Sequence, residues 1–173
     1  LAPWAARLDE AEPQIACEGR YELGRALHRK RRWADAVEPL RAASDLCPDG
    51  EPRVRSQYLL AQALQRKGDS QGAIEAWVAL ADRFPEHSYA DDGLFHAGEL
   101  YAEQGDAEAA ERTYRAAAER FPDGDMVGAG LWDLAWAALE AGRSADALPL
   151  LLRQAAGDPR GDNRGRVLQG RYW

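Results

Sequence analysis

The stretch AGELYAEQGDAEAAERTYRAAAERFP, residues 97–122, predicts two helices joined by a short turn. Ala97 and Tyr101 have the spacing of residues that share one helix face. Gly105 interrupts the pattern, because glycine suits the left-handed residue that ends a helix, and the aspartate after it can cap the next helix. The second helical pattern ends at Pro122, since proline cannot continue a helix. The stretch therefore indicates a helical hairpin.

The same unit recurs along the chain with a step of 37 residues. The prolines that end the units are Pro48, Pro85, Pro122 and Pro159. The turn column contains Arg31, Gly68, Gly105 and Gly142. A small column in the first helix contains Gly24, Ala61, Gly98 and Ala135. An alanine column, expected to face it, contains Ala36, Ala73, Ala110 and Ala147. A column that includes larger residues contains Leu40, Trp77, Tyr114 and Leu151. Because one hairpin cannot bury its apolar face alone, such units are stable only when they stack.

The pattern of Ala97-Gly98 and Tyr101, followed by Ala110 and Tyr114, resembles the tetratricopeptide repeat (TPR). The sequence departs from that repeat where a tryptophan is usual in the first helix, a column that here contains Arg20, Gln57, Leu94 and Leu131. Its period is also longer than the usual repeat of about 34 residues. The resemblance implies an all-α fold, an α-solenoid of TPR-type helical hairpins wound into a right-handed superhelix. No segment alternates with period two, so no strand is predicted.

The repeat divides the chain into three parts. Residues 1–13 are predicted to be the tail of a preceding helix or a cap, closed by Pro13. Four TPR-like hairpins are predicted within residues 14–160, at 17–53, 54–90, 91–127 and 128–160. Residues 161–173 are predicted to begin a fifth hairpin, which is truncated at Trp173.

The long period, together with Arg83-Phe84-Pro85 and Arg120-Phe121-Pro122, is similar to that of bacterial cell-envelope TPR proteins. Two groups share this resemblance: periplasmic coordinators of outer-membrane or cell-division complexes, and the superhelical region of soluble lytic murein transglycosylases. The segments GLWDLAW, residues 130–136, and RVLQGRYW, residues 166–173, resemble the second group.

The resemblance to the transglycosylases implies a non-catalytic module in the periplasm that guides a peptidoglycan strand along its concave groove. That family carries its catalytic glutamate in a Glu-Ser motif, and this chain contains no Glu-Ser pair. No catalytic residue is therefore assigned here, and a catalytic domain of the parent protein is expected beyond Trp173. The alternative is a pure interaction scaffold that binds a protein or peptide. No cofactor is expected in either case.

Charge and hydropathy exclude two classes of partner. The net charge of −7 and the isoelectric point of about 5.0 argue against a nucleic-acid-binding protein, which needs a basic face. No apolar stretch approaches the roughly 18 residues of a membrane span. The charge is also unevenly divided, because residues 18–67 carry 11 basic and 7 acidic side chains whereas residues 68–160 carry 7 and 18. This division could orient a dipolar partner, or it could simply keep the surface solvated.

Residues of the first helices are the candidates for binding a ligand in the groove: Tyr21, Arg25, Tyr58, Gln62, Phe95, Glu99, Trp132 and Trp136. Four of them form an aromatic column with the repeat's step of 37 residues. Together with Trp136, this column could grip a peptide or a sugar chain. The alternative is that the rings fill gaps between neighbouring first helices.

The two cysteines, Cys17 and Cys47, open the first helix and close the second helix of one predicted hairpin. Antiparallel helices bring these ends together, so a disulfide is compatible with the hairpin, and a periplasmic location would permit it. The alternative is two separate buried thiols. The histidines His28, His87 and His96 lie in different repeats without ligand spacing, so no metal site is predicted.

Overall fold

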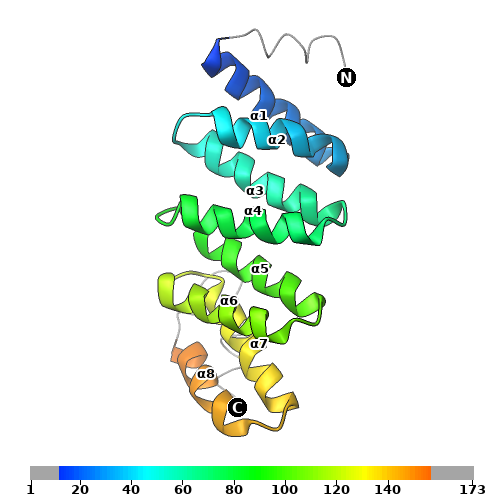
Figure 1. The fold of residues 1–173 in the computed structure, drawn as a ribbon. Helices are drawn as coiled ribbons and strands as arrows, with labels where there is room; N and C mark the ends of the chain where they lie inside the picture. Colours follow the sequence, from blue (N-terminus) through cyan, green and yellow to red (C-terminus); the bar gives the residue numbers. More distant parts are fainter. Residues whose placement is uncertain (1–11, 157–173) are drawn as a thin grey trace. The chain divides into compact units, whose positions relative to one another are not determined.

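The computed structural model describes residues 12–156, which form eight helices and no strand (Figure 1). The helices are α1 (Pro13–Arg29), α2 (Trp33–Leu46), α3 (Glu51–Arg66), α4 (Ser70–Arg83), α5 (Ala90–Glu103), α6 (Ala107–Arg120), α7 (Val127–Glu140) and α8 (Ser144–Ala156). They belong to two compact units, Leu1–Phe84 and Pro85–Trp173. The predicted fold class, an all-α solenoid of TPR-type hairpins, is confirmed. The right-handed winding of the whole chain stays a prediction.

The first unit stacks two helical hairpins, α1–α2 and α3–α4. Helix α3 packs against both α1 and α2, so the second hairpin lies on the first. The core of this unit is fully closed, because Leu40, Trp77 and Leu80 are each 0% exposed. Helix α1 begins at Pro13, in the first turn, where a proline is tolerated because no helical hydrogen bond is lost. Residues 1–11, which hold the predicted tail of a preceding helix, lie outside the described residues, so that prediction stays untested.

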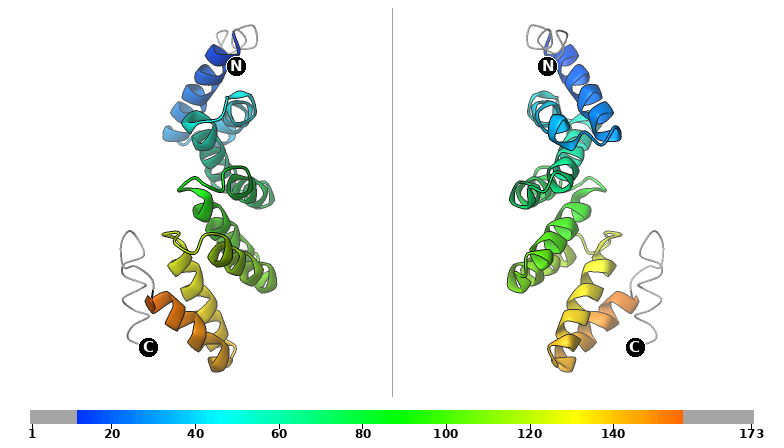
Figure 2. Two further views of the ribbon diagram at one scale, coloured as in Figure 1. Left: turned by 90° about the vertical axis from the view of Figure 1, so that its left-hand side faces the viewer. Right: turned by 90° about the vertical axis from the view of Figure 1, so that its right-hand side faces the viewer.

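The second unit repeats this arrangement with the hairpins α5–α6 and α7–α8. Helix α7 packs against both α5 and α6, and α8 lies beside α7 (Figure 2). Its core cluster contains Phe95, Tyr114, Leu131 and Leu134. Helix α8 ends at Ala156, so the last residues of the predicted fourth hairpin and the predicted start of a fifth, residues 161–173, lie outside the described residues.

The turn inside each hairpin passes through the left-handed region of backbone conformation. The glycines of the turn column have φ angles of +89° at Gly68, +79° at Gly105 and +72° at Gly142. Arg31 holds the same repeat position at φ 57°, although it carries a side chain. Asp69 and Asp106 follow the turn, and each accepts a hydrogen bond from a backbone N–H of the next helix, at 3.0 and 2.9 Å. The predicted combination of glycine turn and aspartate cap is thus confirmed.

The small column makes room for the larger residues of the facing helix. A Cβ atom added to Gly98 would lie 2.5 Å from Cε1 of Tyr114, and one added to Gly130 would lie 3.0 Å from Cδ1 of the same ring. Tyr114 therefore fills the space between the two hairpins of the second unit. In the first unit a Cβ added to Gly24 would lie 2.6 Å from Leu40. The alanine column is buried nearby, but the side chains nearest the glycines belong to the column of Leu40 and Tyr114, which corrects the predicted facing pair.

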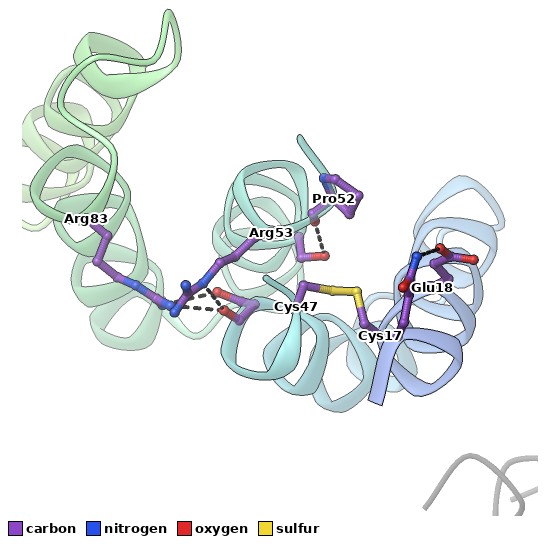
Figure 3. Close-up of a disulfide and its surroundings, with 9 residues drawn as sticks. Cys17, Glu18, Cys47, Pro52, Arg53 and Arg83 are labelled. Atoms are coloured by element: carbon purple, nitrogen blue, oxygen red, sulfur yellow. Dashed lines mark hydrogen bonds between the residues drawn. A yellow bond between two sulfur atoms is a disulfide. The ribbon is translucent and has the colours of Figure 1, made fainter. Parts of the chain in front are cut away.

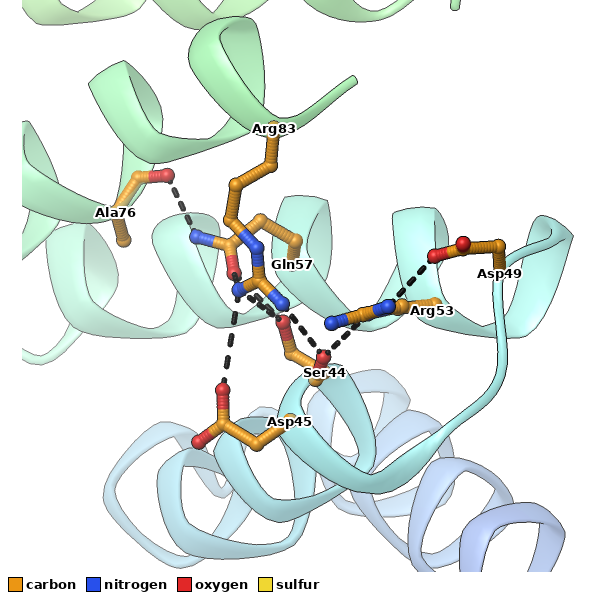
Figure 4. A network of polar contacts seen from close by, with 7 residues as sticks. All are labelled: Ser44, Asp45, Asp49, Arg53, Gln57, Ala76 and Arg83. Carbon is orange, nitrogen blue, oxygen red and sulfur yellow. Dashed lines mark hydrogen bonds and ion pairs between the residues drawn. The ribbon is translucent and has the colours of Figure 1, made fainter. Parts of the chain in front are cut away.

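A polar network joins the two hairpins of the first unit (Figure 4). The Arg83 guanidinium donates to the carbonyl oxygen of Ser44 at 2.9 Å and to Oε1 of Gln57 at 3.1 Å. The Ser44 hydroxyl donates to the same Oε1 at 2.7 Å, and Nε2 of Gln57 donates to the Ala76 carbonyl at 2.8 Å. Arg53 also donates to the Ser44 carbonyl, at 3.0 Å. Both arginines therefore lie at the carboxyl end of α2, where a positive charge is favourable.

The second unit has a simpler version of this contact. Arg153 of α8 donates to the carbonyl oxygen of Ala118, near the carboxyl end of α6. Ala118 occupies the same repeat position as Ser44, two repeats later. In both units, therefore, an arginine of the second hairpin donates to the backbone carbonyl at this repeat position of the first hairpin.

Asp91, near the start of α5, is a buried carboxylate that holds the loop leading to α7. Its Oδ2 atom accepts a hydrogen bond from the backbone N–H of Met126 at 2.9 Å, and the residue is 5% exposed. The loop lies directly on this carboxylate, because a Cβ added to Gly124 would lie 2.5 Å from Oδ2. Burial raises the pKa of Asp91 above its usual value, the Met126 hydrogen bond acts against this rise, and the negative charge of Asp125 adds to it.

We expect Gly98→Ala to lower the free energy of unfolding by about 1–3 kcal/mol, because the added methyl group overlaps the Tyr114 ring. Urea unfolding followed by circular dichroism measures this change. In a Tyr114→Leu background the added methyl group should cost less, since the ring that it overlaps is gone. An equal cost in both backgrounds would show that the close approach of the helices does not depend on this pair.

We expect Asp91→Asn to change how stability depends on pH. The folded-state pKa of Asp91 lies above the unfolded value of about 3.9. The folded protein therefore binds more protons in that window, and the free energy of unfolding falls as pH rises through it. Asparagine keeps an oxygen for Met126 but does not titrate. The stability of the variant relative to the wild type should thus increase as the pH rises above about 4. Asp123→Asn, an exposed change in the same loop, is the control; a difference that stays flat or shrinks contradicts the assignment.

Candidate functional site

Two stacked tryptophans dominate the surface of α7. Trp132 and Trp136 are one helical turn apart, and their ring centroids are 6.1 Å apart with an interplanar angle of 17°. Trp136 is 46% exposed, and its Nε1–H donates to Glu140 at 2.9 Å. We call the shallow depression lined by Trp132, Asp133, Trp136, Ala137 and Glu140 the tryptophan platform. Aromatic faces beside carboxylates can bind a cation, an apolar side chain or a sugar ring.

Trp132 also packs partly against the core cluster of the second unit, which fixes its ring. Both tryptophans were predicted from the sequence to bind a ligand, whereas Asp133 and Glu140 were not. A signal for Glu140 was present, because it follows Trp136 by four residues and such pairs lie on one helix face. The platform is therefore held in place by α7 itself.

The other two candidates of the second unit have different environments. Phe95 is 3% exposed and belongs to the core, where its ring centroid lies 5.9 Å from that of Tyr114. Its place among the groove-binding residues is corrected, since a ligand cannot reach a side chain that is buried in this way. Glu99 is partly buried, and its Oε2 lies 2.8 Å from Nδ1 of His96. The aromatic column therefore contains a core residue in α5 and a surface residue in α7.

In α1, Tyr21 and Arg25 form a local pair. Tyr21 is partly buried and packs against the cluster around Cys17 and Cys47. The Arg25 guanidinium lies 5.6 Å from the centroid of the Tyr21 ring and forms an ion pair of 2.7 Å with Glu22. These two candidates are accessible in part, but each already has a partner on its own helix.

In α3, Tyr58 and Gln62 are also occupied by neighbours. The Tyr58 ring meets the edge of Trp77 at a centroid distance of 5.0 Å, and Trp77 is fully buried. Gln62 is half-buried near His28, whose pKa is lowered by burial and by the positive charge of Arg66, whereas Gln62 acts against this shift. The alternative interpretation, in which rings fill gaps between helices, therefore describes Tyr58 better than Trp132.

Cys17 of α1 and Cys47 at the end of α2 form a disulfide in the structure (Figure 3). Their Cα atoms are 4.9 Å apart, and the two residues are 3% and 2% exposed. The bond closes the open end of the first hairpin, opposite the turn at Arg31. Buried packing with Ala43 and Tyr21 shields it from water.

Neither a metal site nor a membrane-spanning helix is found in the part of the chain that the structure describes. Within residues 12–156, no three histidine, cysteine or acidic side chains gather closely enough to hold a metal ion. None of the eight described helices combines the length and the apolar character needed to cross a membrane.

Stacked hairpins with an exposed aromatic surface define the chain as a helical-repeat solenoid. The sequence matches the tetratricopeptide repeat family over residues 5–51, 58–125 and 95–164, and the chain belongs to this family. TPR solenoids serve as scaffolds for protein–protein interaction, and the chain is one of these scaffolds.

Solved structures with a similar fold include two crystal structures. The crystal structure of MamA has a TM-score of 0.64 and 16% identity, covering 98% of this chain and 88% of that chain. The crystal structure of the apo form of RapI has a TM-score of 0.63 and 16% identity, covering 86% of this chain and 58% of that chain. A search among curated proteins finds no match. At this level of identity, the two structures support the fold alone.

We expect the variant Cys17→Ser/Cys47→Ser to lose about 2–4 kcal/mol of unfolding free energy, because the disulfide restricts the unfolded chain between residues 30 positions apart. Urea unfolding measures the loss. A reducing agent should bring the wild type to the stability of the variant and leave the variant unchanged. A wild type that does not respond to reduction, together with two free thiols by mass spectrometry, would rule the disulfide out.

Proposed function

We propose that this chain is a non-catalytic binding and positioning module of a bacterial cell-envelope protein. The observation that carries the proposal is the tryptophan platform on α7. Large exposed aromatic side chains are frequent anchors of binding surfaces because they bury much area with little loss of conformational freedom. Trp136 is one of the few large hydrophobic side chains that are exposed within residues 12–156, and its ring is already held by Trp132 and Glu140.

The proposed partner is a segment of another protein, bound on the tryptophan platform of α7. Family membership supports a protein partner, since TPR solenoids present extended surfaces built from their repeats. The module would thus hold its partner without changing it chemically.

The proposed location is the periplasm. The disulfide between Cys17 and Cys47 supports an oxidising compartment, because disulfides persist in the periplasm and are rare in the cytosol. The similarity of the Arg-Phe-Pro motifs to those of cell-envelope TPR proteins supports it as well.

A second candidate is the helical domain of a soluble lytic transglycosylase, which would guide a peptidoglycan strand. The stacked rings of Trp132 and Trp136 favour it, since a flat aromatic face suits a sugar ring and the flanking carboxylates of Asp133 and Glu140 can accept hydrogen bonds from hydroxyl groups. The segment GLWDLAW that contains both rings is also the one that resembles this family.

We expect Trp132→Ala/Trp136→Ala to reduce binding by at least about thirtyfold, since aromatic anchors of this kind contribute 2 kcal/mol or more. Two assays measure it: co-sedimentation with purified peptidoglycan sacculi, and capture of periplasmic proteins on the immobilised chain. Leu148→Ala/Leu152→Ala, which removes two exposed apolar side chains of α8, is the matched control.

The two assays separate the candidates. Co-sedimentation with sacculi that the tryptophan variant loses would favour the transglycosylase domain, and capture of a defined protein without affinity for sacculi would favour the scaffold. Binding that survives the tryptophan variant in both assays, with helicity unchanged, would contradict the platform.

A further inference from the structure

A pocket of about 360 Å³ opens between the two hairpins of the second unit, beside the tryptophan platform. All four helices of this unit and two of its turns contribute to the lining of the pocket. A pocket of this volume is large enough for one long side chain of a partner.

The floor of the pocket is apolar and rigid. Tyr114, Leu134 and Leu150 are 5%, 7% and 9% exposed, and all three belong to the core cluster of the unit. Tyr114 is also held between Gly98 and Gly130 of the consecutive first helices. The pocket is therefore built on the packing that stabilises the unit, and an apolar stem could be buried against it.

The rim of the pocket is acidic. Glu111 pairs with Arg115 at 2.9 Å and Asp146 pairs with Arg143 at 3.3 Å. Glu99, whose Oε2 lies 2.8 Å from Nδ1 of His96, Glu103 and Asp133 complete the set, so the lining carries five carboxylates and two guanidinium groups. A neutral or anionic ligand would have to desolvate these groups without compensation.

An organic cation matches these features better than a metal ion. No cluster of three metal-binding side chains occurs among residues 12–156, so the carboxylates are spread around the mouth and do not converge on one point. Arginine combines an apolar stem with a planar cation that can bind several carboxylates and stack on aromatic rings. The electrostatic potential of the second unit also favours a cation. Residues 85–156 carry five arginines and fourteen acidic side chains, which give a net charge of −9 apart from histidine.

We propose that this pocket binds an arginine side chain of a partner peptide. The proposal rests on the proposed function and specifies its partner as a basic peptide segment. Asp133 and Ala137 line both the pocket and the tryptophan platform, so the two surfaces are continuous on α7. An arginine would place its stem on Tyr114 and Leu134 and its guanidinium among the carboxylates, while the neighbouring residues of the peptide contact Trp132 and Trp136.

The test uses the whole chain and a fluorescein-labelled peptide, Gly-Arg-Leu-Gly-Arg-Leu-Gly, with fluorescence anisotropy as the measurement. The same peptide with citrulline for arginine keeps the shape of the side chain and removes its charge. We expect the arginine peptide to bind at least about tenfold more tightly than the citrulline peptide, and this ratio to fall as salt is added.

Three variants assign the binding to the pocket. Glu103→Gln/Asp133→Asn should weaken binding of the arginine peptide by about tenfold or more, whereas Glu119→Gln/Asp123→Asn makes the same change of net charge outside the pocket and should weaken it by less than about threefold. Glu103→Gln alone tests the pocket without touching the platform. Ala107→Leu keeps every charge but narrows the pocket, so it should weaken binding as well.

Equal binding of the arginine and citrulline peptides, or equal effects of the pocket variants and the charge control, would overturn the proposal. Self-association of the chain that Glu103→Gln abolishes, measured by sedimentation velocity, would assign the pocket to a second copy and overturn it too. Failure of the proposed function looks different, because Trp132→Ala/Trp136→Ala would then leave binding to sacculi and periplasmic proteins intact. If the tryptophan variant loses binding to sacculi or periplasmic proteins while the pocket variants keep it, the platform is retained and the pocket is rejected.

Discussion

The close contact between a glycine of one helix and a large side chain of the next is the constraint on which each unit depends. A hairpin buries only part of its apolar surface by itself, so its stability comes from the neighbour stacked on it. Tyr114 fits between Gly98 and Gly130 because neither carries a Cβ atom. The same ring forms the floor of the acidic pocket, and the helix that carries Gly130 also carries the tryptophan platform. The packing that closes the core of this unit therefore also positions its binding surface.

The hairpins could be predicted from the sequence because each column reports a local requirement. Gly105 is predictable because its role depends only on its own backbone conformation. Asp106 is predictable because it caps N–H groups that follow it directly in the sequence. The polar network of the first unit could not be predicted in this way. Gln57 and Ser44 occupy columns that are apolar in the second unit, but they become a pair only when α2 and α3 are known to be adjacent and Arg83 to reach both. Two polar departures in neighbouring columns are the signal that such a network leaves.

In the candidate site, too, the repeat predicts the positions of the residues, whereas their exposure depends on tertiary packing. Phe95 and Trp132 occupy one column, yet the first is a core residue and the second lies beside an exposed ring. Their difference arises from the neighbours that cover each helix, which the repeat does not specify. The acidic pocket was missed for this reason, since its lining comes from four helices and two turns. The pattern of charge along the sequence predicts only that this half of the chain is acidic.

The most direct test of the account is an NMR titration of the whole chain that follows the indole N–H signals of its tryptophans. The ligands are the arginine peptide and soluble peptidoglycan fragments. The account predicts that the signals of Trp132 and Trp136 shift with at least one of them, while that of the fully buried Trp77 stays in place. A ligand that binds and shifts only signals of the first unit, leaving Trp132 and Trp136 unchanged, would contradict the assignment of the binding surface to α7.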